Sequence, residues 1–192
     1  MRTLEKSRKA LALAEKYLEI LEELTDDQEE FEDSFVGAIA VIRRVGNVVD
    51  SESKALGRTS GFDQWWRGTA GDDRRYKCVK DARDLVLKEA GEAAQAQHEV
   101  LVPGAATARA TAYNPSVITE SRIDVVRDGT ELARYTFSTP PASPTDSGAA
   151  APTYRRRWVF RGGECAGEEL IPALRRFLDW MRDDAIPRAE AP

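Results

Sequence analysis

Hydrophobic residues recur every three or four positions along much of the first half of the chain, which is the spacing of amphipathic helices. One stripe predicts a helix over residues 3–24, and a longer one predicts a helix that ends near Ser53. A third predicts a helix from about Asp72 to Gly91. The three stripes consist, in order, of Leu4, Leu11, Ala14, Leu18 and Leu21; of Phe31, Phe35, Ile39, Ile42, Val45 and Val49; and of Tyr76, Val79, Ala82, Val86 and Ala90.

Local signals mark where these helices begin and what joins them. Thr25 followed three residues later by Gln28 has the capping-box pattern at the start of the second helix. Asp72 is the expected N-cap of the third. Between them, residues 62–67 are predicted to form a turn that packs back on the helix pair. Trp65 and Trp66 in this turn favour a core and lid, and a base-stacking platform is the alternative.

Beyond Gly91 the pattern changes to short runs rich in Val, Thr, Ile and Tyr, which predict strands over residues 99–102, 107–113, 123–127, 130–137 and 154–160. Asp128-Gly129 between two of them indicates a tight hairpin. The Pro/Ser/Ala-rich stretch 138–153 predicts a mobile loop. A last amphipathic helix is expected over residues 167–184, with a fraying tail after Ile186.

These elements predict a mainly α (α+β) fold, an up-and-down bundle of four or five helices with a small antiparallel β-sheet inserted between the third and last major helices. We expect a single domain over residues 1–192. The bundle is expected to comprise residues 3–98 and 166–186, and the insertion residues 99–161.

Charge is unevenly distributed in this chain of 192 residues, which has a formal net charge of −5. That balance argues against phosphate binding over the whole surface. From Glu19 to Asp33 there are nine acidic residues and no basic one, whereas residues 43–88 hold eleven basic and seven acidic residues. The acidic run is explained by the start of a helix, and a partner-binding patch is the alternative.

The cysteines and the N-terminus bear on location. Cys78 and Cys165 are too few and too far apart to indicate a disulfide framework or a zinc site, so we expect free thiols in a reducing compartment. The N-terminal segment has a charge every few residues and predicts neither a signal peptide nor a membrane span. A cytoplasmic protein with no membrane partner is expected.

Three arginines lie close to apolar stripes. Arg43 and Arg44 have no acid three or four positions away, and Arg43 is predicted to border the core or a cleft while Arg44 faces water. Arg83 lies between Val79 and Val86, where a charge is costly to bury without a partner. The three consecutive arginines at 155–157 favour a charge-protected edge strand over an RNA contact.

The order of these residues resembles a bacterial branch of the HEPN superfamily (higher eukaryotes and prokaryotes nucleotide-binding domains), over roughly a third of the chain. The matching residues are Phe31, Phe35, Ala40, Arg43, Val45, Val48, Phe62, Trp65, Trp66, Asp72, Arg74, Lys77, Arg83, Asp84, Lys88 and Glu89. Active members have an R-x4-6-H motif, of which Arg83-Asp84 matches the first half. The three positions open to the histidine hold Lys88, Glu89 and Ala90.

The resemblance implies metal-independent RNA cleavage in active members, where arginine and histidine from two copies meet across a helical interface. The histidine moves a proton and the arginine stabilises phosphate charge. Without the histidine, Arg83 remains as the cation, with Glu89 or Lys88 as candidate proton-transfer groups. The sole histidine, His98, lies beyond the motif and favours a structural role, and no metal, cofactor or phosphate-loop motif is found.

Three functions remain open. The first is a catalytically degenerate nucleic-acid- or nucleotide-binding or dimerisation module, with Arg43, Arg83, Asp84, Trp65 and Trp66 as binding residues and a homodimer through the helical hairpin. The resemblance implies a bacterial defence or toxin–antitoxin setting. The second is an active endoribonuclease using Arg83, Glu89 and Lys88. The third is a non-enzymatic partner protein that docks through the acidic segment 19–33.

Overall fold

The computed structural model describes residues 3–57, 59–88, 93–101, 108–111, 121–127, 130–137 and 153–191. The fold is mainly helical with antiparallel strands between α4 and α5, as predicted. Two compact units are present, a helical unit (Met1–Ala94 and Val159–Pro192) and a strand unit (Gln95–Trp158). The predicted limits of the insertion, residues 99 and 161, are close to these boundaries, and the single domain stays a prediction.

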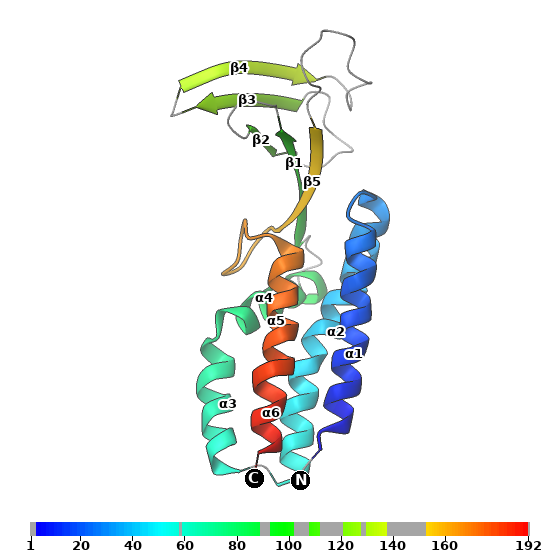
Figure 1. The fold of residues 1–192 in the computed structure, drawn as a ribbon, viewed down its shortest axis with the longest axis vertical. Coiled ribbons are helices and arrows are strands. Elements are labelled where there is room, and N and C mark those ends of the chain that lie inside the picture. The colour runs from blue at the N-terminus through cyan, green and yellow to red at the C-terminus, as the bar shows by residue number, and fades with distance from the viewer. Residues whose placement is uncertain are drawn as a thin grey trace. The chain divides into compact units, whose positions relative to one another are not determined.

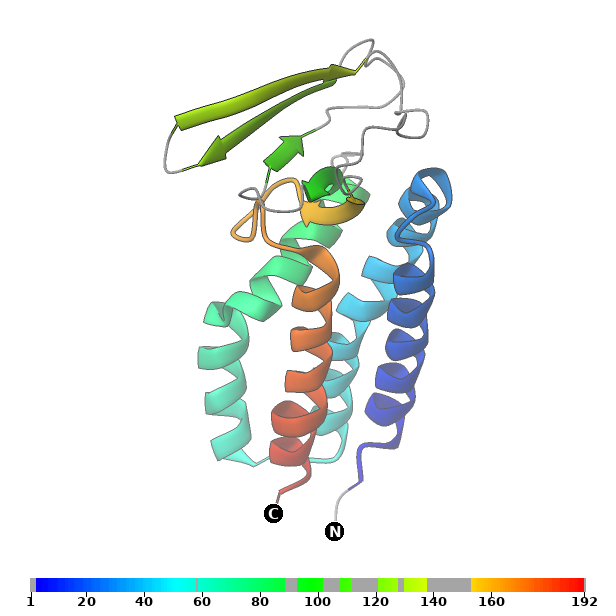
Figure 2. The same ribbon diagram turned by 45° about the horizontal axis from the view of Figure 1, so that its top comes forward.

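The helical unit contains α1 (Glu5–Glu23), α2 (Gln28–Ala55), α3 (Ser60–Asp72), α4 (Arg74–Lys88), α5 (Leu170–Trp180), the π-helical turn η1 (Met181–Ala185) and α6 (Ile186–Glu190). In Figures 1 and 2, α5 and α6 lie between α3 on one side and the antiparallel pair α1 and α2 on the other. The predicted stripes of α1 and α2 are confirmed, since Leu18, Phe31 and Ile42 are at most 3% exposed. Within the described residues, no helix combines the length and apolarity needed to cross a membrane.

Distant carboxylates hold the first turn of α1. Glu52 of α2 accepts hydrogen bonds from the backbone N–H groups of Lys6 and Ser7 at 3.0 and 2.7 Å. Glu190 of α6 accepts from the N–H of Leu4 at 2.9 Å and pairs with Arg8. The hydrogen bond from Arg8 is the main reason that the pKa of Glu190 lies below its usual range. These bonds satisfy N–H groups that no turn of α1 itself can reach.

Several predicted helix ends are wrong. Asp27, not Thr25, caps α2, because its carboxylate accepts from the N–H of Glu30 at 3.1 Å, while the Thr25 hydroxyl donates to the Glu22 carbonyl. Asp73, not Asp72, caps α4 by accepting from the N–H of Arg75 at 2.9 Å. The predicted turn at residues 62–67 is part of the helix α3.

The predicted fraying tail is also wrong, because α6 continues the last helix to Glu190. Ile186 and Ala189 are buried, so the end of the chain contributes to the core. Pro187 lacks a backbone N–H and cannot continue α-helical bonding, and the wider π-helical turn η1 precedes it.

An aromatic cluster joins α3, α4 and α5. Trp66 stacks on Trp180 with ring centroids 6.3 Å apart and meets Tyr76 edge-on at 6.1 Å. The indole N–H of Trp180 donates to Asp184 at 3.1 Å, so its polar group is satisfied inside the core. Each favourable aromatic pair contributes about 0.5–1.5 kcal/mol beyond area burial. The cluster therefore holds α3 against α4 and α5.

The strands form two sheets. One has the order β2 (Ala108–Thr111), β1 (Ala94–Leu101), β5 (Thr153–Phe160), and the other pairs β3 (Ser121–Arg127) with β4 (Thr130–Phe137). The pairings of β1 with β2 and of β3 with β4 are antiparallel. Arg127 pairs with Thr130, which is the register expected for the predicted two-residue hairpin. Residues 128–129 and the predicted mobile loop, except for Thr153 at the start of β5, lie outside the described residues.

The expectation of free thiols is wrong. A disulfide joins Cys78 of α4 to Cys165, with Cα atoms 5.4 Å apart and 87 residues of sequence separation. Both residues are buried. Spacing along the sequence suggested two unrelated cysteines, but the turn at residues 161–169 lies against α4. The reason given for a reducing compartment is thereby removed, and the cytoplasmic location stays a prediction.

Candidate cationic face on helices α2 and α4

The crossing of α2 and α4 is set by a glycine against a tyrosine. A Cβ atom on Gly46 would lie 2.8 Å from Cε2 of Tyr76, a distance that side chains essentially never reach. The Tyr76 ring therefore lies directly on the backbone of α2, where only glycine leaves room. This close approach brings the neighbouring turn of α2, with Arg43, over the ring.

Arg43 is held at this crossing by a ring and an amide. Its guanidinium carbon lies 4.3 Å from the centroid of Tyr76, and its Nη1 donates to Oδ1 of Asn47 at 2.9 Å. The side chain is half-buried, as predicted for a residue that borders the core. Both partners are uncharged, and Arg43 has no carboxylate partner among the described residues. Its positive charge is oriented but not neutralised.

Arg83 lies on the same side of α4, seven residues after Tyr76. Its Nη1 contacts Oδ1 of the adjacent Asp84 at 2.8 Å, and the two side chains are 38% and 24% exposed. Exposed Lys80 lies between Tyr76 and Arg83 at helical spacing. We call Arg43, Tyr76, Lys80 and Arg83 the cationic face.

The predicted site residues are only partly brought together. Trp65 and Trp66 lie on α3 in the aromatic cluster, where Trp66 is 6% exposed, and the guanidinium of Arg188 covers Trp65 at 4.9 Å. Neither belongs to the cationic face, although Trp66 touches Tyr76. The side chain of Lys88 and all of Glu89 lie outside the described residues. Sequence reasoning used Tyr76 only as a core residue and missed Lys80; their spacing with Arg83 was the available signal.

A second arginine with a fixed position, Arg75, lies at the start of α4. Burial alone would raise the pKa of Asp73, but the Arg75 guanidinium and the N–H groups of Arg75 and Tyr76 outweigh it, so the pKa lies below its usual range. The guanidinium of Arg75 also lies 4.8 Å from the Trp180 ring centroid. Asp73 neutralises the charge of Arg75, and the Trp180 ring holds its guanidinium in place. Arg75 is therefore a structural cation.

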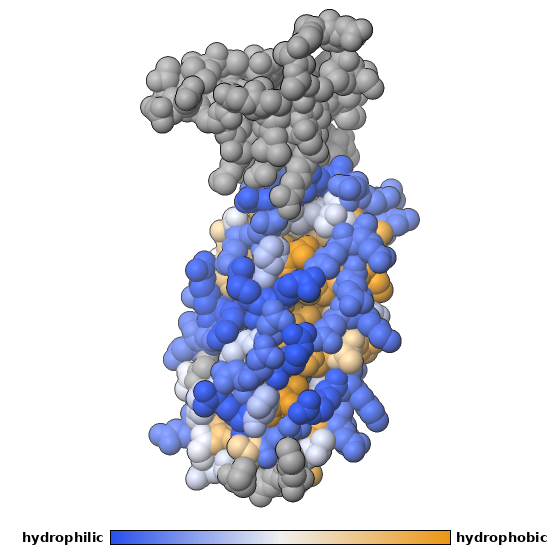
Figure 3. Space-filling view, in the orientation of Figure 1, coloured by the Kyte–Doolittle hydropathy of each residue, from blue (hydrophilic) through white to orange (hydrophobic). Residues whose placement is uncertain are grey.

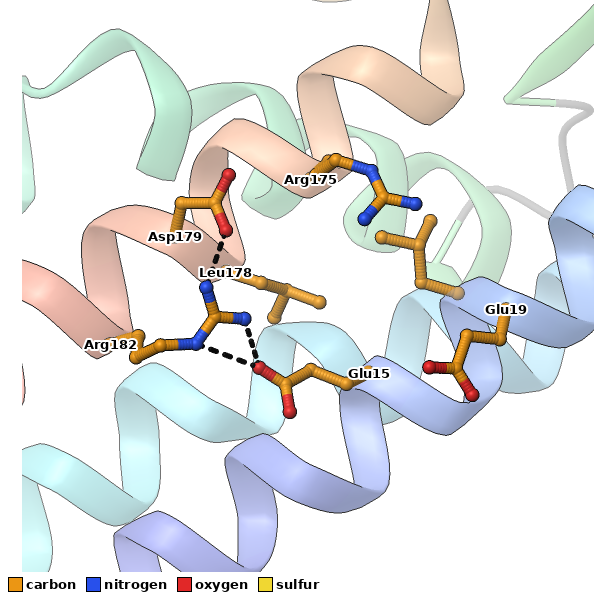
Figure 4. A pocket seen from close by; sticks show the side chains of 7 residues that line it. Glu15, Glu19, Arg175, Leu178, Asp179 and Arg182 are labelled. Atoms are coloured by element: carbon orange, nitrogen blue, oxygen red, sulfur yellow. Dashed lines mark hydrogen bonds and ion pairs between the residues drawn. The ribbon is translucent and has the colours of Figure 1, made fainter.

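A groove between α1 and the α5–η1 helix is the other candidate. It has a volume of about 190 Å³ and is lined by Glu15, Leu18, Glu19, Arg175, Leu178, Asp179 and Arg182. Figure 3 shows hydrophobic residues as a narrow strip between hydrophilic ones on this face of the helical unit. In Figure 4, Arg182 reaches both Asp179 and Glu15. The groove is smaller than a typical ligand pocket of about 300–1,000 Å³.

Some acids of the segment 19–33 have structural roles. Glu22 pairs with Arg175 from α5, and Asp27 caps α2. Glu32 accepts from the Gln28 amide at 3.1 Å. Glu22 and Asp27 of the acidic segment 19–33 are thus explained by a pair between helices and by helix capping. The groove is best described as an ion-paired seam between α1 and α5.

No family model matches this chain, and neither a curated protein nor a solved structure was found to be similar to it. The residues and their geometry are therefore the basis for any functional conclusion.

Proposed function

We propose that this protein is a HEPN-like, non-catalytic module that binds nucleic acid or a nucleotide through the cationic face of α2 and α4. The observation that carries the proposal is Arg43, a guanidinium fixed over Tyr76 and bonded only to neutral Asn47 among the described partners. Phosphate oxygens are suited to arginine because the planar guanidinium offers several N–H donors in a fixed geometry. Holding the side chain in place beforehand reduces the entropy lost on binding.

The absence of catalysis in this proposal follows from the motif. A proton-transfer group contributes typically 10²–10⁴-fold in rate, and the sequence has lysine, glutamate and alanine where a histidine is expected. Arg83 supplies a positive charge, whereas the proton transfer in active members is the role of the histidine. An active endoribonuclease with Glu89 or Lys88 in the histidine's role is the alternative.

The proposal includes a homodimer through the helical hairpin, which would double the cationic face. The setting in bacterial defence or a toxin–antitoxin pair rests on the resemblance alone. A cytoplasmic location would suit intracellular RNA, and it would require that Cys78 and Cys165 be reduced.

The test is the binding of a fluorescently labelled single-stranded RNA, followed by anisotropy in EDTA across a salt series. We expect affinity to fall steeply with salt, and Arg43→Gln to weaken binding several-fold and flatten the salt slope by about one unit. Arg67→Gln is the matched control, because Arg67 is 74% exposed and lies on α3 beside Asp63. A flat salt response, or equal losses in the two variants, would contradict the proposal.

Two further readouts separate the alternatives. Cleavage of the RNA in EDTA by the wild-type protein, lost in Arg83→Ala, would establish the endoribonuclease. Light scattering on the same sample gives the mass, and we expect a dimer. A co-purifying protein that is lost when Glu29, Glu30 and Glu32 are neutralised would instead favour docking through the acidic segment.

A further inference from the structure

The turn at residues 161–169 docks on the side of α4 away from the cationic face. Gly163, with φ of 76°, brings the turn against Asp81, whose carboxylate accepts from the N–H of Glu164 at 3.3 Å. Lys77 pairs with Glu164 at 3.6 Å. The Cys78–Cys165 disulfide lies in the middle of this contact.

A third potential ligand accompanies the two sulfur atoms. Sγ of Cys78, Sγ of Cys165 and a carboxylate oxygen of Glu168 all lie within 4.8 Å of one another. Cys78 and Cys165 are 5% and 2% exposed, and Glu168 is half-buried. Two thiolates and a carboxylate, with water in the fourth position, form a suitable ligand set for Zn²⁺.

We propose that the reduced protein binds one thiophilic divalent cation, of which Zn²⁺ is the type, through Cys78, Cys165 and Glu168. The disulfide and the metal are alternative states of the same site. A dithiol reductant supplies two electrons and two protons, which convert the disulfide to two thiols while the dithiol becomes a disulfide. Binding of the cation then releases the two thiol protons to solvent. The cation itself undergoes no redox change.

The surroundings of Glu168 favour this site. Arg176 hydrogen-bonds Oε1 of Glu168, and Arg74 lies 3.4 Å from Oε2. Such outer partners orient a ligating carboxylate. With a divalent ion, two thiolates and one carboxylate have a net charge of minus one. The positive charges of Arg74, Arg176 and nearby Lys77 balance this charge. Neighbouring cations also favour thiolate over thiol.

The backbone distance suits both states. Zinc–sulfur bonds of about 2.3 Å in a tetrahedron place two sulfur atoms about 3.8 Å apart. The Cα atoms of Cys78 and Cys165, 5.4 Å apart, permit this separation after a rotation about the Cα–Cβ bonds. No shift of α4 is needed, so metal binding leaves the helical unit as it is.

Titration of the full chain with Co²⁺ under anaerobic conditions tests the proposal, because thiolate coordination gives a charge-transfer absorption. We expect one equivalent per chain after reduction and removal of the reductant, none in the oxidised protein, and displacement by Zn²⁺. Absence of the band in the reduced protein would overturn the proposal. This comparison needs no variant and is independent of RNA binding.

Variants then test each ligand. We expect Cys78→Ser to lose more than about 100-fold in affinity and Glu168→Gln at least about 10-fold, since loss of even an outer partner of a ligand typically costs about 10–100-fold. Glu164→Gln is the control, because this carboxylate lies on the same turn but outside the ligand group, and its affinity should not change. Equal affinity of Glu168→Gln and the wild type, with unchanged helix content by circular dichroism, would remove the three-ligand site.

Discussion

The two sides of α4 differ in where their polar groups find partners. Toward the 161–169 turn, Lys77, Cys78 and Asp81 are bound by residues far along the chain. On the side of Tyr76, Arg83 pairs with its neighbour Asp84, and the hydrogen bond of Arg43 stays within α2, although its guanidinium also lies over the Tyr76 ring of α4. Long-range pairs hold a fold together, whereas local pairs only orient a side chain. The first side therefore holds the turn on α4, and the second is the side through which we propose that a ligand binds.

The largest effect should come from the disulfide. Replacing both Cys78 and Cys165 by Ala should lower the free energy of unfolding of the oxidised protein by about 2–5 kcal/mol, because the bond closes a loop with a sequence separation of 87 residues. Urea denaturation measures this difference. In excess reductant the variant and the wild type should become similar, and a persistent gap would show that side-chain packing rather than the cross-link is responsible.

The turn provides a smaller and more local test. Gly163→Ala should destabilise the protein by about 1–3 kcal/mol, since φ is 76° there and a Cβ would lie 2.7 Å from Cβ of Asp81. Gly162→Ala is the matched control, because its Cβ would meet Leu85 at an ordinary 3.6 Å. Thermal unfolding of the two variants measures the difference. Equal melting temperatures would mean that the turn does not dock as described.

Acid should destabilise the N-terminal cap of α4, the helix whose two sides are compared above. The pKa of Asp73 is lowered on folding, so its contribution is complete above the unfolded pKa of about 3.9 and is lost as the pH falls through the lower folded value. At neutral pH, Asp73→Asn should cost about 0.2–1 kcal/mol, because Asn can still cap the helix but loses the charge that pairs with Arg75, and the gap to the wild type should close under acid. Asp72→Asn, at an 89% exposed side chain, should cost little at any pH. A pH-independent gap would contradict the charge-based cap.

Periodicity was sufficient to predict the parts that depend on local pattern. The stripe from Phe31 to Val49 follows from burial of one helix face, and the pairing of β3 with β4 follows from a two-residue hairpin. It could not identify Cys165 as the partner of Cys78, because contacts across 87 residues depend on how the chain returns. The capping-box pattern pointed to Thr25, whereas Asp27 caps the helix. Both residue types suit an N-cap position, and only the geometry decides between them.

The same limit applies to the candidate site. The apolar spacing placed Arg43 at the edge of the core, but the ring beneath it depends on the contact between Gly46 and Tyr76, two residues on different helices. No sequence pattern around either residue predicts its contact with the other. The charged seam between α1 and α5 was missed for the same reason, because Glu15 and Arg182 belong to opposite ends of the chain.

The smallest effect on stability is expected on the Tyr76 side of α4. Arg83→Gln should change the free energy of unfolding by no more than about 0.5 kcal/mol, because Arg83 is 38% exposed and its only described partner, Asp84, is the next residue on the same helix. Its affinity for RNA should nevertheless fall, since a positive charge is lost from the cationic face. Urea denaturation and anisotropy on one preparation measure both quantities. A loss of more than about 1 kcal/mol in the free energy of unfolding would make Arg83 a structural residue. Local pairs on this side of α4 would then stabilise the fold as long-range pairs do on the other side, and the two sides would no longer differ.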